Sequence, residues 1–107
     1  LMPIRSLDGG TMYSNDYIAS LYSFLNQTPE GALRKMLVGA ELTEAHFRIL
    51  VKLAKGADES NFIECFNGDT MGQLRLSPKE SPLKDNFWNI CKKKFATLGL
   101  LRTEKAA

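Results

Sequence analysis

The segment Leu42–Leu50, which reads LTEAHFRIL, is the part of the sequence that decides the fold. Thr43 is a good N-cap residue, and the leucine before it can pack on Phe47 as a hydrophobic staple. Apolar residues then recur at helical spacing, and Gly56 is expected to end the helix in a left-handed conformation. The pattern predicts a core-facing helix over residues 44–55.

Two helices are predicted before this segment. Polar residues at 14–16 can cap the first helix. Apolar residues then follow the i, i+3, i+4 spacing of an amphipathic helix over residues 15–26. Thr28 can cap a second, shorter helix that begins at Pro29 and ends before Gly39.

The chain after residue 56 is less regular. The apolar residues at 62–66 suit either a helical turn or a strand, and residues 67–69 form a turn. Thr70 can cap a short helix, although the alternation over residues 71–76 would also suit a brief strand. Two prolines in residues 77–82 predict a turn there.

The C-terminal part predicts one longer helix. Ser81 can cap this helix, and Pro82 fits its first turn. The helix is expected to extend over residues 83–98 and to end at Gly99. The stretch 100–104 is expected to be a short strand. The apolar residues of this helix gather within about a quarter turn and form one buried stripe: Phe87, Trp88, Cys91, Phe95 and Leu98.

Length and composition predict one globular domain. The chain has 107 residues, of which 44% are apolar and 24% charged, and these values exclude disordered, collagen and coiled-coil classes. Residues 1–13 hold a proline and two glycines without periodicity and are expected to be a flexible arm, followed by a single domain over residues 14–107. No apolar run approaches the roughly 18 to 20 residues that cross a bilayer, so no membrane association is expected.

The sequence predicts neither an enzyme nor a cofactor or metal site. His46 is the single histidine and is expected to be a solvated surface residue. Cys65 and Cys91 lack metal-ligand spacing and are too few for a disulfide scaffold, which favours a cytoplasmic location. No paired carboxylates, activated nucleophile or phosphate-binding loop can be assembled.

The net charge of +2 is unevenly distributed. From Lys79 to the end there are seven basic residues against three acidic ones, a net +4, whereas residues 1–78 carry a net −2. Such asymmetry indicates a surface that faces a polyanion. Opposite the apolar stripe, the last predicted helix carries asparagines, which can read purine edges, and lysines, which neutralise phosphates. The candidate DNA-binding residues are Lys84, Asn86, Asn89, Lys92, Lys93, Lys94 and Arg102.

Two segments resemble a known class of DNA-binding proteins. LTEAHFRIL resembles the LTxxQFxVL opening of MarR-type regulators and of phage or plasmid replication-initiator winged helices, with His46 where those proteins usually have Gln. FATLGLLR, at residues 95–102, resembles the end of a recognition helix and its passage into the wing. The resemblance implies a mainly α fold, a winged helix-turn-helix with two extra N-terminal helices and a small or truncated wing.

The expected function is sequence-specific binding of double-stranded DNA, as a transcriptional regulator of a bacterium, phage or plasmid. The DNA-binding domain of a replication initiator would use the same surface. A third interpretation is a winged-helix module for protein–protein contact, in which residues 92–94 meet an acidic partner. The aromatic excess of the first helix predicts a homodimer through the region of Tyr17, Leu21 and Phe24.

Overall fold

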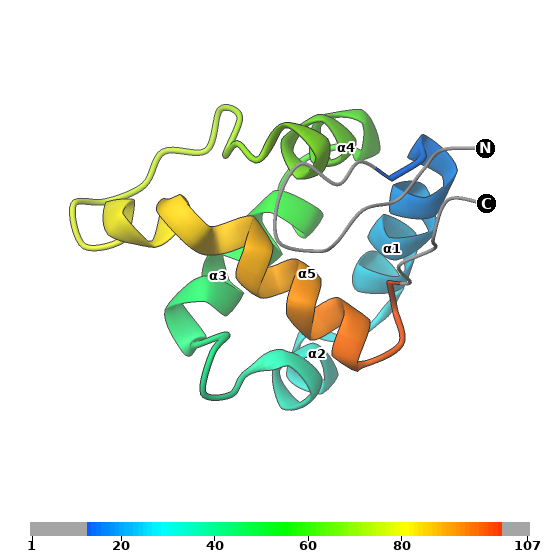
Figure 1. Cartoon of the computed structure of the whole chain (residues 1–107), viewed down its shortest axis with the longest axis horizontal. Helices are drawn as coiled ribbons and strands as arrows, with labels where there is room; N and C mark the ends of the chain where they lie inside the picture. Colours follow the sequence, from blue (N-terminus) through cyan, green and yellow to red (C-terminus); the bar gives the residue numbers. More distant parts are fainter. Residues whose placement is uncertain (1–12, 102–107) are drawn as a thin grey trace.

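The computed structural model describes residues 13–101, and this part of the chain is helical with no strand. Its elements are α1 (Asn15–Gln27), α2 (Glu30–Leu37), α3 (Glu44–Lys55), α4 (Glu59–Gly68), a 3-10 helix η1 (Ser81–Asn86) and α5 (Phe87–Thr97). Helix α5 crosses the front of the molecule, over α3 (Figure 1). The prediction of a mainly α fold is confirmed.

The two N-terminal helices lie where the sequence predicts them. Ser14 caps α1, because its Oγ accepts the backbone N–H of Tyr17 at 3.3 Å. Thr28 does not cap α2 as expected: its N–H and its hydroxyl both donate to the carbonyl of Phe24, at 3.1 and 2.7 Å, so that it closes α1 instead. Pro29 occupies the N-cap position of α2, which begins one residue later than predicted.

Helix α3 begins with a capping box that includes His46. The Thr43 hydroxyl accepts the His46 backbone N–H at 3.5 Å, and His46 Nδ1 accepts the Thr43 backbone N–H at 3.2 Å. The prediction that His46 is a solvated surface residue is wrong, since its side chain is buried and its ring stacks on Phe87 at 6.3 Å between centroids. An imidazole at the third helical position satisfies the same backbone donor that Glu or Gln does in most capping boxes.

The end of α3 differs from the prediction in its backbone conformation. Gly56 has φ −100°, so the expected left-handed stop is wrong. A glycine is favoured at this position for lack of space, because a Cβ would lie 2.6 Å from the carbonyl oxygen of Lys52.

The core forms where α1, α3 and α4 pack on one another and α5 covers them. The apolar residues at 62–66, which were compatible with a turn or a strand, belong to α4. Trp88 of α5 lies against Phe62 and Phe66 of α4, with ring centroids 5.9 and 5.2 Å apart, and its Nε1 donates to the Thr70 carbonyl at 3.0 Å. This cluster of three rings joins α5 to the rest of the core.

Two residues near the N-terminus are more buried than predicted. Tyr13, assigned to the flexible arm, is 1% exposed and exchanges hydrogen bonds with the Asn67 side chain at 3.3 and 3.2 Å; residues 1–12 lie outside the described part. Burial raises the pKa of Tyr13 to about 12. Leu21 is also buried, so its predicted place on a dimer surface is wrong, whereas Tyr17 and Phe24 are half-buried.

The connection between α4 and α5 is long and contains neither the short helix nor the strand considered for residues 70–76. A turn closes instead where the Leu74 N–H donates to the Met71 carbonyl at 3.0 Å. The predicted turn at Ser77 is present and is held by two hydrogen bonds with Glu80. The predicted helix over residues 83–98 is divided into η1 and α5, so its first turns are 3-10 rather than α-helical.

The apolar stripe of α5 is correct except at its end. Leu98 is 36% exposed, so its predicted burial is wrong. The helix stops at Thr97, and Gly99 at φ 79° turns the chain, so that Leu101 is buried instead. Residues 100–101 form a bend and not the start of a strand, and residues 102–104 lie outside the described part.

Candidate nucleic-acid interface

One polar line runs along the exposed side of α5. Asn86, Asn89, Lys93 and Thr97 are spaced three or four residues apart and therefore share one face of the helix. Asn86, Lys93 and Thr97 are exposed, and Asn89 is half-buried. Thr97 was not among the predicted contact residues, although its spacing from Lys93 would have identified it. We call these four residues the α5 face.

The two asparagines of the α5 face form a pair. Asn89 Nδ2 donates to Asn86 Oδ1 at 3.0 Å. Asn86 is the N-cap residue of α5, but its side chain makes no capping bond to a backbone N–H. The hydrogen bond leaves the amino group of Asn86 and the carbonyl oxygen of Asn89 available, so the pair keeps a donor and an acceptor at the start of the helix.

Lys84 and Lys94 flank the α5 face. Lys84 lies exposed on η1, and Lys94 is half-buried beside the α2–α3 loop, where its Nζ is 3.9 Å from the position of a Cβ on Gly39. That loop and the end of α5 enclose a groove of about 310 Å³, which both Lys93 and Lys94 line. In residues 13–101 none of these three lysines forms an ion pair, while Glu41 lines the same groove.

Lys92 does not belong to this surface, so its predicted role as a DNA contact is wrong. Its side chain is 4% exposed, its Nζ lies 3.3 Å from Asp69 Oδ1, and the same ammonium lies 4.8 Å from the Phe66 ring centroid. On a helix, three consecutive residues point in directions about 100° apart, so three adjacent lysines cannot share a face. The middle of α5 therefore directs one of them at the core.

The remaining predicted contact, Arg102, lies outside the described residues. Elsewhere in the described part, three of the five bases of α2 and α3 form ion pairs: Arg34 with Glu30 and Glu44, Arg48 with Glu44, and Lys52 with Glu80. Five of the seven predicted residues therefore lie on α5 or on η1 directly before it: Lys84, Asn86, Asn89, Lys93 and Lys94.

The histidine and both cysteines are buried in the fold. His46 Nδ1 belongs to the α3 cap, and burial lowers the pKa of its imidazole. Burial raises the pKa of the Cys91 thiol well above its usual range and raises that of Cys65 as well. Among residues 13–101, no three His, Cys, Asp or Glu side chains are grouped as metal ligands would be.

The comparisons with known proteins give no further guide to function. No protein-family model, curated protein or solved structure matches this chain. In the described part, no helix combines the length and the apolar character that crossing a membrane requires.

Proposed function

We propose that this protein binds double-stranded DNA, with the α5 face in the major groove, and that it acts as a sequence-specific regulator. The observation that carries the proposal is the alignment of Asn86, Asn89 and Lys93 on the exposed side of one helix. A helix fits the major groove, which is about 12 Å wide, and only side chains on its exposed side can reach base edges there.

The asparagine pair supplies the chemistry for reading bases. A donor next to an acceptor matches the N7 and N6 amino group of adenine, which asparagine recognises in the major groove. The hydrogen bond between Asn86 and Asn89 holds both amides before binding, which lowers the entropy lost when a base is contacted.

The lysines supply affinity for phosphates. Lys93 extends from the α5 face itself, Lys84 lies on η1 just before it and Lys94 lies next to Lys93, so these lysines can reach the phosphates that border the groove. For the winged-helix form of the fold the proposal relies on the sequence resemblance alone. In this chain residues 69–86 separate α4 from α5, a longer connection than the three to four residues of a helix-turn-helix turn.

The proposal is tested by binding to duplex DNA at several salt concentrations. Sites are selected from a random duplex library, and affinities are measured by fluorescence anisotropy. Lys93→Ala should weaken binding to selected and random duplexes alike and reduce the slope of log K against log salt by about one unit. Asn89→Ala should cost about 1–3 kcal/mol on the selected site and little on random DNA.

Lys55→Ala is the matched control for charge. Lys55 is an exposed base on α3 whose ammonium points to the carbonyls of Asn26 and Thr28, so its loss should leave the salt slope unchanged. The proposal is wrong if the protein binds no duplex at low salt. It is also wrong if a triple substitution of Asn86, Asn89 and Lys93 by alanine keeps full affinity.

A further inference from the structure

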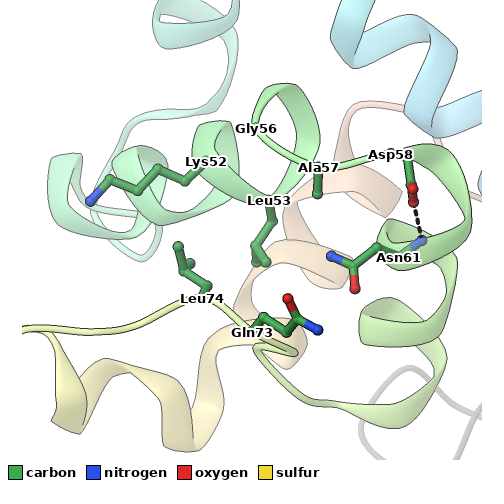
Figure 2. Close-up of a pocket in the computed structure, with 8 residues that line it drawn as sticks. All are labelled: Lys52, Leu53, Gly56, Ala57, Asp58, Asn61, Gln73 and Leu74. Atoms are coloured by element: carbon green, nitrogen blue, oxygen red, sulfur yellow. Dashed lines mark hydrogen bonds between the residues drawn. The ribbon is translucent and has the colours of Figure 1, made fainter.

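A second concave surface lies away from the α5 face. It has a volume of about 510 Å³, within the roughly 300–1,000 Å³ of small-molecule sites. The end of α3, the start of α4 and the loop that follows α4 enclose it (Figure 2). We call it the α3–α4 groove; its lining residues are Lys52, Leu53, Gly56, Ala57, Asp58, Asn61, Gln73 and Leu74.

Two side-chain amides face each other in this groove. Asn61 extends from α4 and Gln73 from the loop, and Figure 2 shows both amide groups pointing into the same space below Leu53. Among residues 13–101, neither side-chain amide has a hydrogen-bond partner. Each amide can donate and accept, so the groove presents two complete sets of hydrogen-bonding groups that no described protein group uses.

The backbone positions both residues at the groove. Asn61 lies in the first turn of α4, where its N–H donates to the capping carboxylate of Asp58 at 2.8 Å. Gln73 lies in the turn that Leu74 closes, after Gly72 at φ 59°. A Cβ on Gly72 would lie 3.3 Å from Asn61 Oδ1, so glycine lets the loop approach close to Asn61.

The charged groups of the groove already have partners. The Asp58 carboxylate caps α4, and the Lys52 ammonium lies 3.8 Å from Glu80 Oε2. The two neutral amides are therefore the polar side chains of the groove that no other described group engages. The accessible apolar part of the wall comes from the half-buried Ala57 and Leu74, because Leu53 is 2% exposed and offers almost no surface. Such a site suits a flat, uncharged molecule with donors and acceptors along one edge.

We propose that the α3–α4 groove binds the base of a free nucleoside. A nucleobase carries donors and acceptors along its edge, which asparagine and glutamine amides recognise, and apolar faces that side chains can contact. Its edge pairs with Asn61 and Gln73, and a face rests on Leu74 and Ala57. This site is separate from the α5 face and does not depend on DNA binding.

The test follows the side-chain amide signals of the ¹⁵N-labelled full chain by NMR during titration with uridine, cytidine, adenosine and guanosine. The NH₂ signals of Asn61 and Gln73 should shift saturably with at least one of them. The NH₂ signal of Gln27, an exposed residue at the end of α1, should stay unchanged. Ribose alone should shift neither of the two groove amides.

Two variants and a control complete the test. Asn61→Ala and Gln73→Ala should each weaken binding about tenfold, as expected for the loss of about 1.4 kcal/mol of hydrogen bonding, and Gln27→Ala should not change it. Gln73 is exposed, so its variant tests the idea even where Asn61→Ala perturbs folding. The proposal is overturned if millimolar nucleoside moves neither amide signal, if ribose moves them equally, or if Gln73→Ala binds as well as the unchanged chain.

Discussion

Replacing Lys92 tests whether this lysine is buried while the adjacent Lys93 is exposed. Lys92→Ala removes three methylenes that are buried in the native fold, at about 0.8 kcal/mol each, and a cation–π contact worth about 0.5–2 kcal/mol. The ammonium no longer has to be desolvated, which offsets part of this loss. Asp69, with 53% of its side chain exposed, stays hydrated without its partner and adds little to the cost. We expect a net loss of about 2–3 kcal/mol.

Urea unfolding followed by circular dichroism measures this loss. With an m-value of about 1–2 kcal/mol/M for a small protein, the midpoint should fall by about 1–3 M. Lys92→Met keeps an apolar stem of similar length and should stay within about 1 kcal/mol of the unchanged chain. Lys93→Ala, at an exposed site, should stay within about 0.5 kcal/mol. Equal midpoints for Lys92→Ala and Lys93→Ala would show that Lys92 is not buried, and the orientation given to α5 would be wrong.

Three further changes test the fold. Burial lowers the pKa of His46, so the unfolded chain binds the proton more tightly than the folded chain. The free energy of unfolding, measured by urea titration, should therefore fall as the pH drops below about 6.5. His46→Gln keeps a capping side chain and should flatten this pH dependence. Gly72→Ala should lower the free energy of unfolding by at least about 1–2 kcal/mol, because φ is 59° and the new Cβ would lie 2.8 Å from Cys65 Sγ. Gly31→Ala, with open space in α2, should stabilise the fold slightly. Equal thermal midpoints for the two variants would contradict this reasoning. Trp88→Ala should cost about 3–5 kcal/mol by calorimetry, and a loss below about 1 kcal/mol would mean that the indole is not part of the core.

Local sequence signals predict α1 and α3 well. Both helices combine a capping residue with apolar residues at helical spacing, so each is specified by neighbours within a few positions. His46 shows the limit of such reasoning, since its burial depends on Phe87, which lies 41 positions further along the chain. The division of residues 81–97 into η1 and α5 also lacks a clear local signal, because Pro82 is compatible with the first turn of either kind of helix.

The sequence predicts the candidate site only in part, because local patterns do not show contacts with distant parts of the chain. Helical periodicity places Asn86, Asn89 and Lys93 opposite the apolar stripe, and the structure agrees. The same periodicity places Lys92 near the border of that stripe, where charge alone suggests exposure. Its burial requires Asp69, whose left-handed backbone at φ 52° ends α4 and brings a carboxylate to α5. No pattern within the last helix could reveal that partner.

The lysine triplet consists of three amines with different chemical reactivity. An acylating reagent modifies an amine that solvent can reach, and here exposure decreases from Lys93 to Lys94 to Lys92, whose side chain is 4% exposed. Acylation of the native protein should follow that order, and Lys92 should react only when α5 separates from Asp69 and Phe66. Mass spectrometry of label at Lys92 would therefore count opening events of the core, with Lys93 in the same peptide as the internal standard for reagent exposure.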